Sequence, residues 1–534
     1  MLDPARFRLK SPLAALGLGF ALALAGPAAS APVPLSSVTE GAVVVRKFDP
    51  DLTTRFAFAR TVGAILGSAA IPNTPANRQA LVASLVATFN ASQQVNPVSG
   101  LAMKVDPRPA ESGLSPAQLL DPAHPRGLMP IGLFSRFDLA PADWSDCGEH
   151  RIVYGNKPGQ PRFFLIFEAK IPNPSPSLGI KGCRPLAMAW RAIGLSTTAA
   201  GRNARLEQLY YAGIPNFRAA VHHLNYGTPL GQVRSNSFVQ GPWQLREFRI
   251  LAVAPGVLQF RAAPAASNPL AEFYKDNPAG TALEQSERTK FRIDFGNLYQ
   301  PRLRSVDSTE PLANYRMLLF NTMGAGFELR SSEFQSSVDP SDDPSLLAGT
   351  QIRGVIPASW TAPAPFANRT ISEAQMLNRA TVITCAGCHQ PASRQVSTVG
   401  GTPIIWPNSL GFVHISEFVD ASGNHPISDA LSFAFVPFRR QALLNVANSD
   451  SAALPAGLTA LQLRLFAPAS PTARASALSR RSTAETLSRQ ILRAGRAGDS
   501  VIRDQALTLE RLSDEGHQRE MEERGAFMEF RRPH

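Results

Sequence analysis

Cysteine is scarce in this sequence, with four residues in a chain of 534. That scarcity excludes a small disulfide-rich scaffold, in which cysteine is dense and the chain is short. Hydrophobic residues make up 44% of the chain, which is enough to build cores without such cross-links, over roughly two to four domains. The cysteines fall into two pairs, Cys147 with Cys183 and Cys385 with Cys388, and each pair needs its own explanation.

Long apolar runs are absent after the first 31 residues. At the start, three basic residues precede an apolar stretch from 13 to 26, which is followed by Ala29-Ser30-Ala31. This order is typical of a secretory signal and predicts cleavage after Ala31. No later stretch reaches the roughly 18 apolar residues that a membrane helix needs. We therefore expect an exported protein, periplasmic or secreted, with no transmembrane segment.

Several sequence signatures of common functions are also missing. No G-x-S-x-G, H-E-x-x-H, P-loop or G-x-G-x-x-G pattern supports a hydrolase, a nucleotide-binding or a dinucleotide-binding protein. The net charge is +12, but the excess is spread along the chain and not gathered in runs, which argues against nucleic acid as a partner. General composition accounts for this charge, with docking of an anionic partner or a membrane surface as the alternative. The oligomeric state stays open.

The pair Cys385 and Cys388 is followed directly by His389, which completes a Cys-x-x-Cys-His motif. With four cysteines and nine histidines in 534 residues, chance would produce this pentapeptide with a probability of about 0.0005. On a helix this spacing places both thiols and the imidazole on one face. The thiols can then bond the haem vinyl groups and the imidazole can ligate the iron. The motif resembles the attachment site of c-type cytochromes and predicts one covalently attached haem c.

Two rival interpretations of the motif remain. Cys385 and Cys388 could form a redox or structural disulfide, although thioredoxin-like chemistry needs a strand before the motif. They could also bind zinc with His389, which requires another ligand that no second cysteine pair provides. A capping box of Thr370 and Glu373, followed by a stretch without proline, predicts that one helix over residues 371–388 delivers the motif.

The second axial ligand of such a haem is not a downstream methionine, since none follows His389 until Met521. His414 is the nearest histidine, in an apolar segment rich in aromatic residues, and we predict it as the second ligand to the metal. The next candidates are His425, Met376 and residues of the N-terminal part. A sixth position left open is the alternative, and it would favour a haem-dependent oxidoreductase over an electron carrier. A redox partner protein is expected for a carrier.

Acidic, arginine and histidine residues alternate densely around Cys147: Arg136, Asp138, Asp143, Asp146, Glu149 and His150. Such a cluster is more typical of caps and ion pairs beside a disulfide than of a catalytic or metal site. We predict that Cys147 and Cys183 are bonded to each other, since they are the cysteines left once the haem pair is assigned. Two buried free thiols are the alternative.

The pattern of helices and strands predicts an α+β fold, with a large N-terminal mixed domain followed by a mainly helical CxxCH-bearing segment. Strands are expected over 151–154, 162–169 and 290–295, and as a hairpin around Pro255-Gly256. Helices are expected between 51 and 92, one of them capped by Thr74, while residues 93–130 are expected to form surface loops. The predicted segments are a signal peptide (1–31), an α+β scaffold domain (32–335), a linker-like segment (336–368), the haem-bearing segment (369–450) and a helical C-terminal extension (451–534).

Five stretches carry a wider resemblance: Arg136 to Pro141, Cys147 to Val153, Phe167-Glu168 with Pro172-Asn173-Pro174, Trp243 to Phe248, and Thr384 to His389 with Phe412-Val413-His414. Together they resemble an uncharacterised group of secreted bacterial proteins that carry one CxxCH. The resemblance covers much of residues 130–450. It implies export and a shared architecture, and it implies no particular activity.

Overall fold

The computed structural model describes residues 32–265, except 98, 142, 228, 229 and 242, and residues 413–449. Between them it describes short pieces at 281–282, 285–286, 289, 337–338, 359–361, 370–372, 389, 396–399, 402–405 and 410. The predicted signal peptide, both motif cysteines, the strand expected at 290–295 and the C-terminal extension lie outside the described residues.

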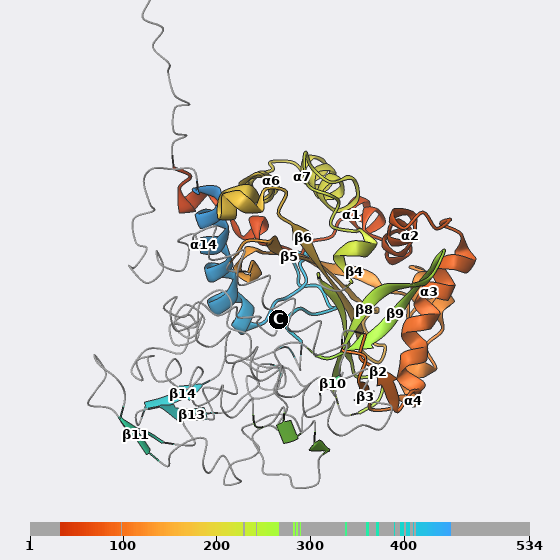
Figure 1. Cartoon of the computed structure of the whole chain (residues 1–534). Coiled ribbons are helices and arrows are strands. Elements are labelled where there is room, and N and C mark those ends of the chain that lie inside the picture. The colour runs from red at the N-terminus through yellow and green to blue at the C-terminus, as the bar shows by residue number, and fades with distance from the viewer. Residues whose placement is uncertain are drawn as a thin grey trace, which may run out of the picture.

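An antiparallel sheet of eight strands forms the centre of the described structure (Figure 1). Along the sheet the order is β1 (Val44–Val45), β4 (Met129–Arg136), β5 (Asp146–Gly155), β6 (Phe163–Pro172), β7 (Gln232–Ser237), β8 (Gln244–Ala254) and β10 (Ser337–Val338), with β9 (Val257–Ala263) also paired to β8. The predicted strands at 151–154 and 162–169 and the predicted hairpin are confirmed. Within the predicted linker, β10 pairs with the first half of β8 and so extends the sheet.

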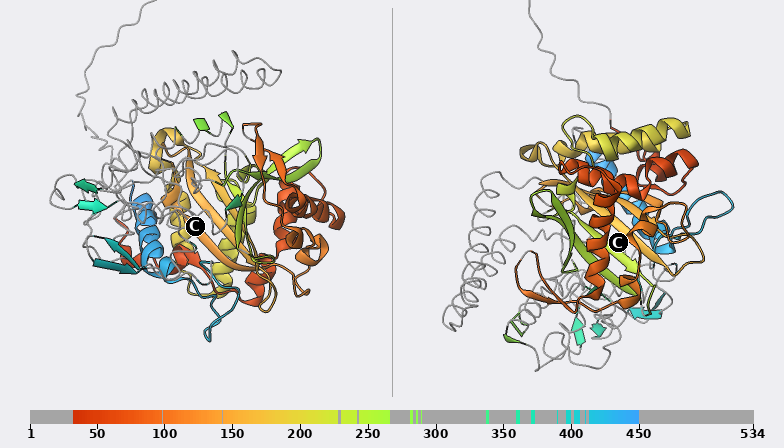
Figure 2. Two further views of the ribbon diagram at one scale, coloured as in Figure 1. Left: turned by 90° about the horizontal axis from the view of Figure 1, so that it is seen from below. Right: turned by 90° about the vertical axis from the view of Figure 1, so that its right-hand side faces the viewer.

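Helices surround one face and the edges of this sheet. They are α1 (Pro50–Arg55), α2 (Phe58–Ser68), α3 (Pro75–Ala87), α4 (Pro109–Ser112), α5 (Pro116–Leu120), α6 (Arg184–Gly194) and α7 (Ala199–Glu207). The predicted cap of α3 is confirmed, because the Thr74 hydroxyl accepts a hydrogen bond from the Asn77 amide at 3.2 Å. Figure 2 shows α3 lying across the sheet. No helix in the described part of the chain is long and apolar enough to cross a membrane.

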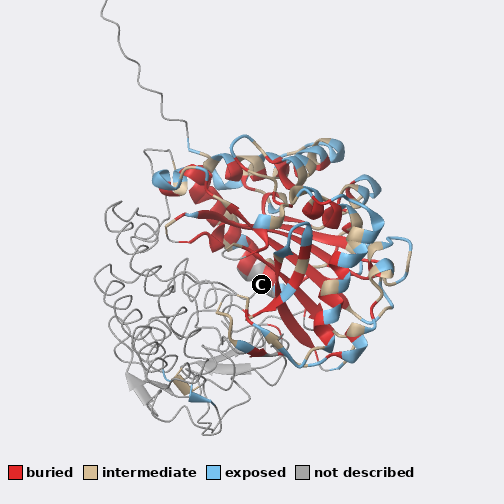
Figure 3. Cartoon of the chain, turned by 45° about the vertical axis from the view of Figure 1, so that its right-hand side comes forward, coloured by how far each residue is buried: buried red, intermediate tan, exposed pale blue. Residues whose placement is uncertain are grey.

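The two faces of the sheet differ in chemistry, because successive side chains of a strand point to opposite faces. On the helix-covered face, apolar residues such as Ile152 and Phe167 are fully buried, and Phe58 of α2 packs against Phe167 with ring centroids 6.2 Å apart. On the other face the same strands carry charged residues. These are buried as well, so the sheet has almost no exposed surface at its centre (Figure 3).

A disulfide joins Cys147 in β5 to Cys183, which directly precedes α6. The two Cα atoms are 5.5 Å apart and both residues are fully buried. The predicted pairing is therefore confirmed. The bond fixes α6 against the strand whose charged side chains form part of the candidate site.

Two local predictions were wrong. Residues 93–130 were expected to be loops, but they contain the hairpin of β2 (Gln93–Val95) and β3 (Ala102–Lys104) as well as α4 and α5. The helix expected from residue 371 does not begin there, because β12 (Thr370–Ser372) pairs with β11 (Ser359–Thr361). Residues with branched or aromatic side chains face each other across this pair and favour a strand over a helix. Residues 373–388 lie outside the described part.

The segment 413–449 packs against the N-terminal residues. It ends in α14 (Val436–Ala447), which lies beside α6 in Figure 1. Asn448 donates to the Val33 carbonyl at 2.9 Å and accepts from the Val33 amide at 2.6 Å. The Arg184 guanidinium donates to the Ala447 carbonyl at 2.9 Å. These contacts fix α14 to the first part of the chain and hold the segment over the charged face of the sheet.

Candidate functional site

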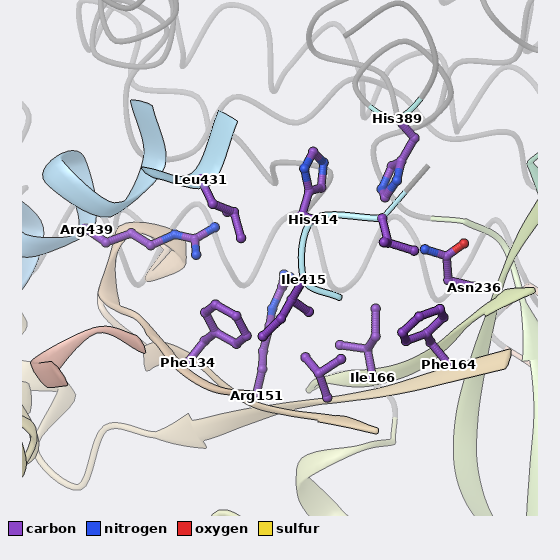
Figure 4. A pocket seen from close by; sticks show the side chains of 12 residues that line it. Phe134, Arg151, Phe164, Ile166, Asn236, His389, His414, Ile415, Leu431 and Arg439 are labelled. Atoms are coloured by element: carbon purple, nitrogen blue, oxygen red, sulfur yellow. The ribbon is translucent and has the colours of Figure 1, made fainter. Parts of the chain in front are cut away.

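A pocket lies between the charged face of the sheet and the segment 413–449 (Figure 4). The strands contribute Phe134, Arg151, Val153, Phe164, Ile166 and Asn236, and the covering segments contribute His389, Val413, His414, Ile415, Leu431 and Arg439. The strand residues share a face because the register pairs Phe134 with Arg151 and Val153 with Ile166.

The two histidines that the sequence singled out meet in this pocket. His389 is 2% exposed and His414 is 7% exposed, and their ring centroids are 4.6 Å apart with a tilt of 50°. Trp243 stacks on the His389 ring at 5.1 Å with an interplanar angle of 25°. Trp243 belongs to one of the stretches that carry the wider resemblance, but its contact with His389 was not predicted. Within the described residues, no group of three or more histidine, cysteine, aspartate or glutamate side chains is placed to hold a metal ion.

A hydrogen bond to Ser428 fixes the orientation of the His414 ring. Its Nδ1 atom lies 2.9 Å from the Ser428 hydroxyl, which also accepts a hydrogen bond from the Leu431 amide at 3.2 Å. The Ser428 amide in turn donates to the His414 carbonyl at 2.9 Å. A histidine fixed in this way through one ring nitrogen has the orientation of many metal-ligating imidazoles, which use the other nitrogen. Next to His414, Ile415 forms an isolated antiparallel bridge with Ile427.

His425, the next candidate ligand, has a different position. It is buried outside the pocket lining, and its Nδ1–H donates to the carbonyls of Ser416 and Phe418 at 2.9 and 3.0 Å. Burial lowers the pKa of His425, and the two carbonyls oppose that shift. Its amide donates to the Arg46 carbonyl at 2.8 Å. His425 therefore ties the turn that follows His414 to the N-terminal residues. Met376 lies outside the described part.

On the sheet face that borders the pocket, charged side chains alternate in sign across the four strands β5 to β8. We call this set the charged row; it consists of Glu149, Arg151, Glu168, Arg234, Glu247 and Arg249. Arg151 contacts Glu149 at 2.6 Å and Glu168 at 3.1 Å. Arg234 contacts Glu168 at 3.5 Å and Glu247 at 2.9 Å, and Arg249 contacts Glu247 at 3.0 Å. Cross-strand register brings these residues together, so each charge has an oppositely charged neighbour.

The carboxyl groups of the charged row differ in pKa. Burial raises the pKa of Glu168 more than Arg151 and Arg234 lower it. Burial also acts to raise the pKa of Glu149, but the attraction of Arg151, Lys170 and Arg234 outweighs it and lowers the pKa to about 2. Gln232 bridges the two carboxyl groups, donating to Glu168 at 2.6 Å and to Glu149 at 3.2 Å. Of these two carboxyl groups, Glu168 is therefore protonated more easily than Glu149.

The charged cluster around Cys147 consists of ion pairs and caps, as predicted. Arg136 donates to both oxygens of Asp138 at 2.9–3.1 Å, and Lys170 lies 3.5 Å from Asp146. The Asp146 carboxylate also accepts from the Gly148 amide at 2.9 Å. His150 accepts a hydrogen bond from the Trp190 indole at 2.9 Å, and burial lowers its pKa to about 3. These groups support the disulfide region and do not line the pocket.

No protein-family model, no curated protein and no solved structure matches this chain. Its function is therefore argued from its own residues.

Proposed function

We propose that the protein is an exported single-haem c-type protein, which acts in electron transfer or as the haem-bearing part of an oxidoreductase. The observation that carries the proposal is that His389, the imidazole of the CxxCH motif, is buried at this pocket and lies beside His414. Cys385 and Cys388 would hold the haem by thioether bonds, on a mainly helical segment, and His389 would ligate the iron. When bound, the haem supplies one-electron redox chemistry.

The lining of the pocket suits a haem. Aromatic and aliphatic side chains, among them Phe134, Phe164 and Leu431, exclude water from the space next to His389. Arg151 and Arg439 belong to the same lining, and guanidinium groups can pair with carboxylates such as those of a haem. The donor set therefore fits one covalently held haem with His389 as its first axial ligand.

We further propose His414 as the second axial ligand. Two imidazoles on opposite sides of a haem iron have ring centroids about 6 Å apart, because each metal–nitrogen bond is about 2 Å long and each nitrogen lies about 1 Å from its ring centre. The His389 and His414 rings are 4.6 Å apart. Ligation by both therefore requires the rings to separate by more than 1 Å when haem binds. An iron held by His389 alone needs no such movement and would leave a position for a substrate.

The attachment of haem is tested by producing the full chain in cells that have the cytochrome c maturation machinery. We expect the denatured protein to stain for haem, because a thioether-bound cofactor survives denaturation. The variant with Cys385→Ser and Cys388→Ser should lose the stain. Cys147→Ser with Cys183→Ser is the matched control and should keep it. A denatured wild-type polypeptide that does not stain for haem would contradict the proposal.

The role of His414 is tested by the absorption spectrum of the loaded protein. We expect His414→Ala to convert a low-spin iron to a high-spin iron without releasing the haem, since one axial nitrogen is removed. His425→Ala removes another buried histidine, one that lies outside the pocket lining, and should leave the spin state unchanged. A wild type that is already high-spin means an open position and favours an enzyme. A low-spin His414→Ala protein assigns the ligand to another residue.

The second candidate is a haem-free secreted binding or structural protein. Two imidazoles on one tetrahedral ion have ring centroids about 5 Å apart, which is closer to the observed 4.6 Å than the haem value. In that case Cys385 and Cys388 either form a local disulfide or bind zinc. Zinc would need a further ligand that no second cysteine pair provides. Metal analysis and thiol counting separate the cases: a local disulfide yields two thiols on reduction beyond those of Cys147 and Cys183, without haem or zinc.

A further inference from the structure

The indole ring of Trp243 stacks on the imidazole ring of His389. The ring centroids are 5.1 Å apart and the ring planes differ by 25°. Trp243 is 3% exposed and His389 is 2% exposed, so the contact is removed from bulk water. Trp243 comes directly before β8, whereas His389 belongs to the CxxCH motif. The stack therefore joins the sheet to the motif.

The indole is itself fixed by the sheet. Its N–H donates a hydrogen bond to the side-chain oxygen of Asn236 in β7. The register of β7 and β8 pairs Asn236 with Leu245, so these two side chains share one face of the sheet. Leu245 and Ala265 pack with Trp243 in one buried cluster. Figure 4 shows Asn236 beside His389, at the same end of the pocket. The imidazole therefore packs against a surface that two paired strands hold in place.

A second tryptophan–histidine pair shows what is particular about this contact. Trp190 and His150 have ring centroids 6.0 Å apart and ring planes that differ by 17°. There the indole N–H donates to Nδ1 of the imidazole at 2.9 Å and so occupies one of its two nitrogens. An indole has one N–H group, and that of Trp243 is directed to Asn236. Trp243 therefore contacts His389 through the ring face, without a hydrogen bond to either imidazole nitrogen.

A contact of this kind suits a metal ligand for two reasons. It orients the imidazole without competing for the nitrogen that binds the metal. The face of an indole also carries negative potential, which favours positive charge on a ring that stacks on it. An imidazole gives more electron density to ferric than to ferrous iron and so carries more positive charge in the ferric state. The indole therefore stabilises the ligand more strongly when the iron is ferric.

We propose that Trp243 is the positioning residue of His389: it fixes the ring plane in which His389 ligates the iron, and it favours the ferric state. Asn236 in turn fixes the indole. Neighbours that touch a ligand and not the metal commonly orient the ligand and tune the redox properties of the metal. This inference rests on the proposed function, because the stack has a chemical consequence where His389 is a ligand.

The contact is tested first in the haem-free full chain, Cys385→Ser with Cys388→Ser, labelled with ¹³C in its histidine rings. The NMR signal of His389 is assigned by its loss in His389→Gln. A proton over the face of an indole is shielded, so we expect Trp243→Leu to move this signal downfield. Trp243→Phe keeps an aromatic face and should move it less. Trp190→Phe, which alters the other tryptophan–histidine pair, is the matched control and should leave the His389 signal in place. An unchanged His389 signal in folded Trp243→Leu overturns the proposal.

The second test measures the reduction potential of the haem-loaded protein. We expect Trp243→Leu to raise it, so that the ratio of oxidised to reduced protein at a fixed potential falls by about threefold, the effect of one cation–π contact. Trp243→Phe should lie between, and Trp190→Phe should match the wild type. A purely structural defect that admits water to the pocket would stabilise the ferric charge and lower the potential instead. A lowered or unchanged potential in Trp243→Leu therefore overturns the proposal.

The two readouts separate this inference from the proposed function. Haem staining reports whether the cofactor is attached, and the His389 signal of the haem-free chain reports the stack. A wild type that stains for haem, with a His389 signal that does not respond to Trp243→Leu, overturns the inference and leaves the function. If the wild type does not stain but the signal responds, the failure lies with the proposed function, and the orienting contact of Trp243 stands.

Discussion

Replacing Arg234 by methionine should lower the free energy of unfolding by about 3–5 kcal/mol, the usual cost of removing one partner from a buried ion pair. Arg234 is 2% exposed and contacts both Glu168 and Glu247, which are fully buried. Without the guanidinium, two carboxylates stay in a low-dielectric environment with less compensation, so the folded state is penalised. Denaturation in urea, followed by tryptophan fluorescence, measures the change.

The matched control for Arg234 is Arg55→Met. Arg55 also contacts two carboxylates, Asp51 and Glu207, but its side chain is 32% exposed. Water and salt screen such pairs, so the expected loss of stability is much smaller than for Arg234→Met. Adding Glu247→Gln to Arg234→Met should recover part of the loss, because it removes one of the uncompensated charges. A loss for Arg234→Met no larger than that of Arg55→Met would show that the charged row is hydrated.

Loss of the Cys147–Cys183 disulfide should cost about 4 kcal/mol on the chain-entropy model, given the sequence separation of 36 residues. The bond restricts the unfolded chain, and its removal also leaves two small polar groups in a fully buried position in the variant with Cys147→Ser and Cys183→Ser. Urea denaturation of this variant and of reduced wild type measures the effect. The variant should be insensitive to reductant.

Two results would contradict this second prediction. One is a variant as stable as the oxidised wild type, which would mean that the loop between the two cysteines is already ordered in the unfolded chain. The other is a free thiol at Cys147 or Cys183 in non-reducing peptide maps of the exported protein. The Cys→Ala pair separates the entropy of the loop from the cost of burying serine hydroxyls.

Patterns of neighbouring residues in the sequence were enough to predict several strands of the sheet. The strands at 151–154 and 162–169 were visible as apolar runs, the cap of α3 as Thr74-Pro75, and the disulfide as the cysteine pair outside the motif. Each of these depends on residues close in sequence or on a count of one residue type. The segment at 370–372 shows the limit, because its pairing with β11 outweighed a capping-box signal.

Other parts of the site depend on contacts between strands that are far apart in the sequence. Patterns of neighbouring residues do not predict which strands pair. Glu149 stood out in the sequence, but its relation to Arg234 and Glu247 follows from the order β5–β6–β7–β8, which composition does not encode. A partial signal was present: β7 carries Gln232, Arg234 and Asn236 at alternate positions, and β8 carries Glu247 and Arg249 two residues apart. The stacking of Trp243 on His389 had no such signal.

The hydrogen bonds between Val33 and Asn448 close a loop of 415 residues, and this sets an order of events during folding. Closing so long a loop costs only about 2 kcal/mol more than closing one a tenth as long, so the native contact is affordable at equilibrium. The effect on the folding rate is larger, because contacts between residues far apart in the sequence slow folding. At roughly 5–20 residues per second, a ribosome needs roughly 20–80 s to reach Asn448 after Val33. Because α14 is the last described element of the chain, it can cover the charged face of the sheet only after the strands of the sheet have been synthesised.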